Sequence, residues 1–251
     1  MSAKITSQTP SSEKNLAARK KLFALFAERP LPDEELLVNM GLYIRSGALA
    51  KLLFLNEIYE KIITLPGAIL EFGVWRGQSL VVFENLRAVH EPYNHARKIY
   101  GFDTFEGYPE IGEYDKRSDI ISENTYAVEA NYEQYLNELL DYHEQENVMS
   151  HIKKHALIKG DASVTCRKFM SDHPETLIAM AYFDMALYKP TKDCLEAIMP
   201  RMVKGGIVVF DELNNPDYPG ETQAFMEVIG PRNFEMTRSR FLPDRVYVTI
   251  R

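Results

Sequence analysis

Acidic side chains follow successive apolar runs along this chain. Their type and spacing make them the best candidates for binding a ligand or a metal ion. Each run has the composition of a buried strand. The acids are Glu71, Asp103, Asp161, Asp184 and the pair Asp211 and Glu212. One such acid is a common helix cap, and Asp161 fits that alternative for a helix starting at Ser163. Acids grouped at one sheet edge would repel one another without a cation or a hydroxyl-rich ligand.

The stretch from Leu70 to Ser79, LEFGVWRGQS, predicts a buried strand, a turn that contains glycine, and a helix. Such a turn presents free backbone N–H groups at a helix N-terminus, where an anionic group can bind. Gly73 has no side chain that would keep a ligand from the backbone. Glu71 suits a cation or a hydroxyl donor rather than a phosphate. The alternative is an ordinary strand-to-helix turn with a solvated Glu71.

The spacing of Asp103 and of the glycines limits which class of ligand this turn can bind. Asp103 ends the next predicted strand, where an acid can hold ribose hydroxyls. The glycines form G-x-x-x-G, from Gly73 to Gly77, which disfavours a nicotinamide or flavin dinucleotide. The absence of a Walker lysine excludes a P-loop. An adenosine ligand without pyrophosphate fits better, with its ribose at Asp103, its adenine amino group near Asp161 and a cationic amino-acid end near Glu71.

A second acidic group suits a metal ion. Asp184, Asp211 and Glu212 come from two neighbouring strand ends and offer hard oxygen ligands for Mg²⁺ or Ca²⁺. The alternative is that Asp211 and Glu212 flank the next helix and bind nothing.

Apolar periodicity predicts an α/β fold in which strands alternate with helices. The predicted strands are 68–73, 98–103, 155–159, 178–184, 206–211 and 245–250, and the predicted helices between them are 78–89, 131–145, 163–172, 190–201 and 220–229. This order implies a doubly wound, mostly parallel sheet. The last strand follows an irregular stretch that contains proline, which makes it a candidate for antiparallel pairing.

The same pattern divides the chain into parts. Residues 1–13 are polar, without the apolar segment of a signal peptide, and we expect them to be disordered. Residues 14–65 predict a helical cap, and residues 66–251 the α/β domain. The long insertion 108–150 leaves the end of the second strand, and we expect a lid there rather than a plain surface excursion. Its part 108–130 is expected to be mobile without ligand and to order over the acceptor.

Composition limits the class of protein. The 251 residues carry a net charge of −7, from 29 basic and 36 acidic residues, which argues against nucleic-acid binding through a broad basic surface. Cys166 and Cys194 are too few for a disulfide framework. No apolar run is long enough to span a membrane. We therefore expect a cytoplasmic protein that binds neither nucleic acid nor membranes.

Taken together, several stretches between residue 70 and about residue 229 resemble one enzyme family. They are LEFGVWRGQS, GFDTFEGYP, KGDA, YFDMALYKPTKDCLEAIMPRMVKGGIVVFDE and YPGE. The chain resembles the class I S-adenosylmethionine-dependent methyltransferases, and within them the macrocin O-methyltransferase family. That family includes sugar O-methyltransferases of antibiotic biosynthesis, and FDELNNPDYPGE is similar to the branch acting on nucleotide-linked deoxysugars. The resemblance implies a seven-stranded Rossmann-like sheet.

The resemblance also implies roles for the acids. Around S-adenosylmethionine it implies Glu71, Gly73 and Ser79 at the methionine end, Asp103 at the ribose, and Asp161 with Ala162 near the adenine. It implies a divalent ion, usually Mg²⁺, held by Asp184, Asp211 and Glu212. The hydroxyl of a sugar or sugar-nucleotide acceptor would lose its proton to Asp184 or to a nearby base. We also expect a homo-oligomer.

Two positions depart from the family pattern. Ala186 stands where members often carry a second acid, and Asn214 stands where the close branch tends to have Asp. Both changes reduce the negative charge of the site. The alternatives are a methyltransferase of another small-molecule hydroxyl and a non-catalytic nucleotide-binding protein that has lost the metal. An NAD-dependent oxidoreductase is disfavoured by the missing glycine fingerprint.

Overall fold

The computed structural model describes residues 12–109, 111–116, 122 and 124–251. The chain divides into two compact units, Met1–Lys51 and Leu52–Arg251. Most of the segment predicted to be disordered, and part of the predicted lid, lie outside the described residues. Helix α3 (Ser46–Glu60) runs across the boundary between the units.

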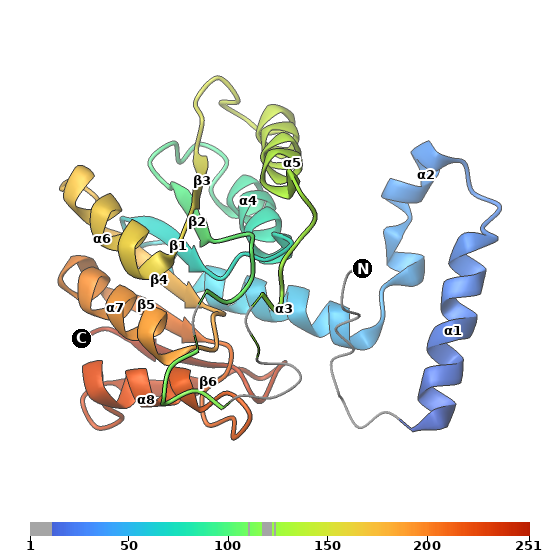
Figure 1. Ribbon diagram of the computed structural model, residues 1–251. Coiled ribbons are helices and arrows are strands. Elements are labelled where there is room, and N and C mark those ends of the chain that lie inside the picture. Colours follow the sequence, from blue (N-terminus) through green and yellow to red (C-terminus); the bar gives the residue numbers. More distant parts are fainter. Residues whose placement is uncertain (1–11, 110, 117–121, 123) are drawn as a thin grey trace. The chain divides into compact units, whose positions relative to one another are not determined.

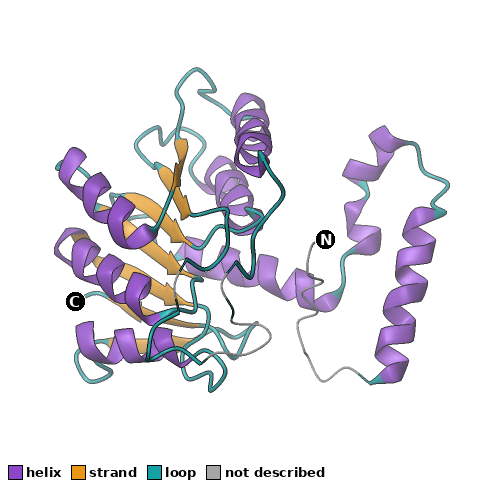
Figure 2. Cartoon of the chain, in the orientation of Figure 1, coloured by secondary structure: helices purple, strands orange, loops and turns teal. Residues whose placement is uncertain are grey.

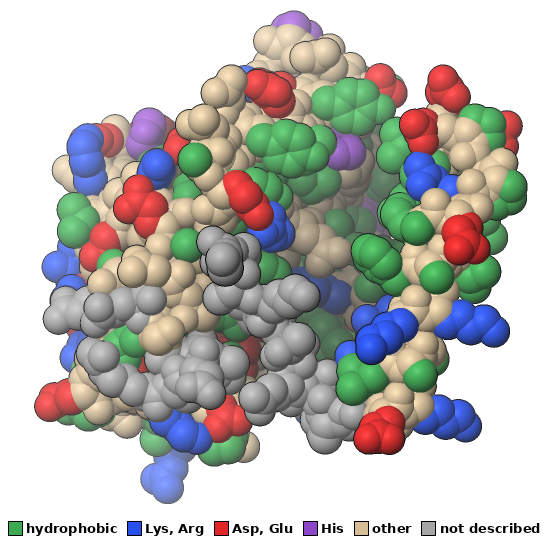
Figure 3. Space-filling model, turned by 45° about the vertical axis from the view of Figure 1, so that its right-hand side comes forward, with side chains coloured by type: hydrophobic (Ala, Val, Ile, Leu, Met, Phe, Trp, Pro, Cys, Tyr) green, Lys and Arg blue, Asp and Glu red, His purple; other side chains and the backbone are tan. Residues whose placement is uncertain are grey.

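The first unit is helical. It contains α1 (Glu13–Ala27), α2 (Asp33–Val38), the 3₁₀ helix η1 (Met40–Tyr43) and the first turns of α3. Ser12 caps α1, because its hydroxyl accepts a hydrogen bond from the Asn15 N–H. None of the residues of α1, α2 and η1 is buried. Hydrophobic side chains therefore lie beside Lys and Arg on the surface of these helices (Figure 3).

The second unit contains a seven-stranded sheet (Figure 1). The strands are β1 (Ala68–Phe72), β2 (Ile99–Asp103), β3 (His155–Lys159), β4 (Ile178–Phe183), β5 (Met202–Phe210), β6 (Glu235–Arg238) and β7 (Val246–Thr249). Their order is β3-β2-β1-β4-β5-β7-β6. Strands β1 to β5 pair in parallel, and β7 pairs antiparallel with both β5 and β6. The predicted doubly wound sheet and its antiparallel last strand are confirmed, whereas β6 was not predicted.

Helices cover both faces of the sheet (Figure 2). They are α4 (Gln78–His90), α5 (Tyr132–Glu146), α6 (Ala162–Asp172), α7 (Tyr188–Ile198) with the 3₁₀ helix η2 (Met199–Arg201), and α8 (Pro219–Val228). One core cluster joins α6, α7 and α8 to the sheet, and the other joins α3, α4 and α5 to the opposite face. In the second cluster, Phe54, Leu55, Ile58 and Tyr59 of α3 are fully buried. The second half of α3 is therefore part of the α/β core.

The strand order reverses between β1 and β4. From β1 the chain passes outward to β2 and β3, then returns to place β4 on the other side of β1. The helices that follow these two strands, α4 and α7, pack on opposite faces of the sheet. Ligands of open α/β sheets bind beyond the carboxyl ends of the strands at such a reversal. All residues of β1 and β4 are buried, as expected for central parallel strands. The candidate site is therefore sought at this edge.

Candidate active site

The glycine turn closes directly onto the end of β4. Gly73 has a φ of +90°, and a Cβ there would lie 2.1 Å from the Asp184 carbonyl oxygen. The Asp184 N–H donates to the Phe72 carbonyl oxygen at 2.8 Å, so the two backbones are joined at this point. The sequence predicted that a ligand would use the space beside Gly73. The structure shows that the backbone of Asp184 occupies it.

Glu71 and Ser79 flank this turn on its two sides. Glu71 lies in β1, and Ser79 lies in the first turn of α4, which begins after Gly77 at a left-handed φ of 77°. Both side chains are buried. Their position beside the turn is compatible with the predicted methionine end of the donor, which stays a prediction.

Asp103 links the glycine turn to the loop after β2. Its Oδ2 accepts a hydrogen bond from the Trp75 N–H at 2.7 Å, and its Oδ1 accepts one from the Phe105 N–H at 2.6 Å. Burial raises the pKa of Asp103, and these backbone hydrogen bonds partly oppose the rise. The residue predicted to hold ribose therefore also fixes the shape of the turn.

Asp161 caps α6. Its side chain accepts a hydrogen bond from the Ser163 N–H at 2.9 Å, which confirms the capping alternative. Ala162 follows as the first helical residue; its side chain is buried, and its carbonyl oxygen lies 3.3 Å from the Cys194 Sγ. Contact of Asp161 and Ala162 with adenine stays a prediction.

Asp211 at the end of β5 is held by two groups that the sequence did not indicate. Its Oδ1 accepts a hydrogen bond from the buried Tyr182 hydroxyl at 2.7 Å. The same oxygen lies 2.5 Å from Arg245 Nε, and Arg245 Nη1 donates to the Asp211 carbonyl oxygen at 2.8 Å. Asp211 is thus paired with a cation that comes from the start of β7. No spacing rule in the sequence connects these two distant positions.

Glu221 adds a further acid from the first turns of α8. Its Oε2 accepts a hydrogen bond from the Glu212 N–H at 2.7 Å, and Asn215 Nδ2 donates to Glu212 Oε2 at 2.6 Å. Burial, then the charge of Asp211, raises the pKa of Glu212 to about 7 and that of Glu221 well above its usual range. Glu221 was not predicted as a site residue. The only indication of it in the sequence was its place in the YPGE stretch.

The chemistry of these groups fits a divalent cation in part. Buried carboxylates that raise one another's pKa, and a Glu221 Oε1 without a hydrogen-bond partner among the described residues, are what a bound cation would relieve. Against this, Arg245 already neutralises Asp211. The set Asp184, Asp211 and Glu212 is not among the groups of described residues whose ligand atoms lie within 4.8 Å of one another.

Such a group does occur elsewhere, in Glu84, Glu144 and His155 between α4, α5 and β3. Arg87 is ion-paired with both glutamates, and Lys154 is ion-paired with Glu144. The two negative charges are therefore already balanced inside the fold. We interpret this cluster as a structural ion-pair network.

The two departures from the family pattern share a backbone conformation. Ala186 and Asn214 both have a φ of 61°. Asn adopts this left-handed region more readily than most residues, which gives Asn214 a structural reason. Ala186 is buried, and its carbonyl oxygen would lie 3.1 Å from a Cβ at position 220. The loop after β4 therefore packs closely against the first turn of α8.

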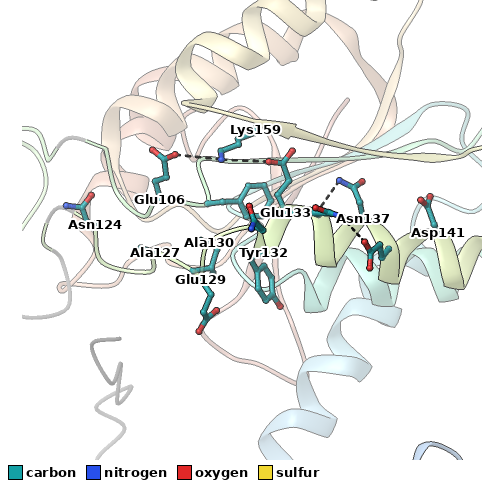
Figure 4. Close-up of a pocket in the computed structure, with 15 residues that line it drawn as sticks. Glu106, Asn124, Ala127, Glu129, Ala130, Tyr132, Glu133, Asn137, Asp141 and Lys159 are labelled. Carbon is teal, nitrogen blue, oxygen red and sulfur yellow. Dashed lines mark hydrogen bonds and ion pairs between the residues drawn. The ribbon is translucent and has the colours of Figure 1, made fainter. Parts of the chain in front are cut away.

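A cleft of about 960 Å³ lies beside the end of β3, between the loop after β2 and the exposed side of α5 (Figure 4). Five of the fifteen lining residues are acidic, and the Lys159 Nζ lies 3.7 Å from a carboxylate oxygen of Glu106 and 3.9 Å from one of Glu133. It includes none of the predicted donor or metal residues.

A seven-stranded sheet with this strand order, a glycine turn after β1 and acids at the following strand ends defines the methyltransferase fold. The same fold occurs in the O-methyltransferase NovP, which superposes with a TM-score of 0.58 at 19% identity over 80% of this chain and 79% of that one. The sequence profile of the macrocin-O-methyltransferase (TylF) family matches residues 48–227. The chain belongs to this family.

Individual relatives agree with that assignment. The calicheamicin methyltransferase CalS11 superposes with a TM-score of 0.92 at 38% identity, over 95% of this chain and 93% of that one. An apo structure of CalS11, described as a TDP-rhamnose 3'-O-methyltransferase, gives a TM-score of 0.84 at 37% identity, over 95% of each chain. The 8-demethyl-8-(2,3-dimethoxy-alpha-L-rhamnosyl)-tetracenomycin-C 4'-O-methyltransferase of Streptomyces olivaceus is 27% identical over 151 residues, which are 59% of this chain. That match spans 53% of the Streptomyces protein, about half of its length.

Proposed function

We propose that this chain is an S-adenosylmethionine-dependent O-methyltransferase that acts on a hydroxyl of a sugar or sugar nucleotide in natural-product or polysaccharide biosynthesis. The observation that carries the proposal is the junction of Gly73 and Asp184, because it joins the donor turn to the acidic edge at the point where the strand order reverses. The similarity to CalS11, a TDP-rhamnose 3'-O-methyltransferase, supports a nucleotide-linked deoxysugar as the acceptor.

The reaction requires little covalent chemistry from the protein. Methyl transfer from a sulfonium is an in-line displacement, so the site must chiefly align donor and acceptor. The proposed donor residues are Glu71, Gly73, Ser79, Asp103, Asp161 and Ala162. Asp184, at the junction, is the proposed general base, which accepts the proton of the acceptor hydroxyl. Asp184, Asp211 and Glu212 would hold the proposed Mg²⁺. When bound, that ion would supply Lewis-acid activation of a hydroxyl.

Methyl transfer from labelled S-adenosylmethionine to TDP-rhamnose tests the activity. We expect Asp184→Asn to lower kcat by about 10² or more, because a general base typically contributes that much. The affinity for S-adenosylhomocysteine, measured by calorimetry, should stay within about twofold. Asp172→Asn, at an exposed position of α6, is the matched control. If Asp184→Asn retains full turnover, the assignment of the base is wrong.

The metal has its own test. Thorough chelation followed by Mg²⁺ addition should abolish and then restore transfer while donor binding persists. Binding of Mn²⁺ to the protein without substrates, followed by electron paramagnetic resonance, gives a second readout. Glu212→Gln should weaken the binding of Mn²⁺ without disturbing the ion pair between Asp211 and Arg245. Full activity after chelation would remove the ion from the proposal and leave Asp184 as a plain base.

Other parts of the proposal concern location and assembly. No helix in the described part of the chain is long and apolar enough to cross a membrane. A cytoplasmic location and a homo-oligomer stay predictions. The non-catalytic alternative, motivated by Ala186 and Asn214, predicts donor binding without transfer to any acceptor, so the same labelled-donor assay decides between the two.

A further inference from the structure

Three tyrosines from two loops meet beside the acidic edge. Tyr108 and Tyr126 lie in the insertion between β2 and α5, and Tyr218 directly precedes α8. The rings of Tyr108 and Tyr126 are 5.4 Å apart in an edge-to-face arrangement. The hydroxyl oxygens of Tyr126 and Tyr218 are 3.4 Å apart. We call these three residues the tyrosine cluster; each is only half-buried, so each keeps a free surface.

The tyrosine cluster also reaches the glycine turn. Trp75, within that turn, packs edge-to-face on Tyr126 with ring centroids 5.7 Å apart. It is the single tryptophan of the chain, and its side chain is exposed. The Trp75 N–H is bound to Asp103, so its backbone is fixed. The aromatic surface therefore extends from the proposed donor side to the acidic edge.

The tyrosine hydroxyls stay neutral in this place. Burial raises the pKa of Tyr108, and the negative charges of Asp184 and Glu212 raise it further. Burial and the same two acids also raise the pKa of Tyr126. A protonated phenol adds no charge to an acidic edge, and it can donate a hydrogen bond as well as accept one. These groups thus suit a neutral ligand rich in hydroxyls.

We propose that Tyr108, Tyr126 and Tyr218 form the binding surface for the sugar ring of the acceptor and determine its specificity. The inference rests on the proposed function and names the acceptor class, a neutral pyranose with a large C–H face such as a 6-deoxyhexose. Its C–H face lies on the tyrosine rings, and its hydroxyls bond to the phenols.

Trp75 makes the test independent of turnover. Its fluorescence is followed while the protein, saturated with S-adenosylhomocysteine, is titrated with TDP-rhamnose or with TDP alone. Tyr126→Leu should raise the Kd for TDP-rhamnose about tenfold and Tyr218→Phe about fivefold, with little change for TDP. Tyr93→Leu removes an exposed tyrosine outside the cluster and is the matched control. Thermal melting and unchanged S-adenosylhomocysteine affinity check that each variant is folded.

The outcomes separate this inference from the proposed function. The tyrosine variants should raise the KM for TDP-rhamnose more than they lower kcat, as expected for substrate contacts. Methyl transfer with equal Kd and KM in wild type and variants would overturn the tyrosine surface and leave the function standing. Absence of both transfer and a Trp75 response, for TDP-rhamnose and a panel of neutral rhamnosides, would contradict both.

Discussion

Arg245 changes what Asp211 can do. The buried Asp211 carboxylate pairs with the partly buried Arg245 guanidinium, so loss of Arg245 would leave a buried charge without its cation. The positive charge of Arg245 therefore compensates much of the negative charge that Asp211 brings to the acidic edge. A cation at this edge would compete with Arg245 for Asp211, whereas the Asn215 amide that donates to Glu212 is neutral and leaves the charge of that carboxylate in place.

Gly73 is the residue at which a small change should have the largest effect. Gly73→Ala would place a Cβ 2.1 Å from the Asp184 carbonyl oxygen at a φ of +90°. We expect a loss of at least about 3 kcal/mol in the free energy of unfolding, measured with urea. Gly47→Ala is the control, because a Cβ there meets nothing within 4 Å; it should leave stability unchanged or raise it by up to about 1 kcal/mol. Equal stability of the two variants would contradict the clash.

His143 on α5 should make the fold sensitive to mild acid. Burial lowers its pKa below the ordinary 6.5, against the opposing charges of Glu84 and Glu146. The unfolded chain then binds more protons just below pH 6.5, so stability is lost as pH falls through that range. His143→Gln should flatten the urea-unfolding stability between about pH 5 and pH 7. An NMR titration midpoint of His143 at or above 6.5 would contradict the prediction.

Polar contacts close the base of the insertion and join it to the glycine turn and to α7. Near its base, the Tyr108 N–H donates to the Thr125 carbonyl oxygen at 3.1 Å. At the glycine turn, Arg76 is ion-paired with Glu129 at 2.9 Å. At the start of α7, the Tyr188 N–H donates to Asp115 Oδ1 at 2.8 Å. These contacts position the described part of the insertion beside the site, as a lid requires, and its closure stays a prediction.

Gly107 controls the base of this insertion. Its φ is +84°, and a Cβ would lie 2.5 Å from the Thr125 carbonyl oxygen. Gly107→Ala should separate the two chain segments at the base of the insertion and speed amide hydrogen exchange at Tyr108 and Asn124 about tenfold or more. Acceptor KM should rise while S-adenosylhomocysteine affinity holds. Gly112→Ala, where a Cβ meets Asp115 Oδ2 at an ordinary 3.4 Å, is the control and should leave exchange unchanged.

At the scale of the whole molecule, the first unit should be dispensable for folding. Its helices α1, α2 and η1 bury none of their residues, whereas the second half of α3 is part of the α/β core. A chain that starts at Ser46 should keep its thermal midpoint within a few degrees and bind S-adenosylhomocysteine. If residues 14–65 form the predicted cap over the acceptor, the shortened chain should have a higher KM for the acceptor. Failure of this chain to fold would show that the first unit supports the core.

Local patterns in the sequence were sufficient to predict the class of fold and the sheet edge at which the acids lie. Continuous apolar runs are typical of strands buried on both faces, and acids that follow them must reach the same edge when the strands are parallel. That reasoning required only local pattern and held for β1 to β5. Strand β6 was not predicted because Glu235–Arg238 is mostly exposed and has no apolar run.

Tertiary structure decided which groups touch those acids. Arg245 reaches Asp211 only because β7 pairs with β5, and the tyrosine cluster forms only because the insertion meets the loop before α8. Gly73 faces the backbone of Asp184 because β4, far along the chain, lies next to β1. Such contacts join residues that are distant in sequence and leave no periodic signal. The chain pattern places the acids, and the long-range packing sets their charge, their partners and the surface offered to an acceptor.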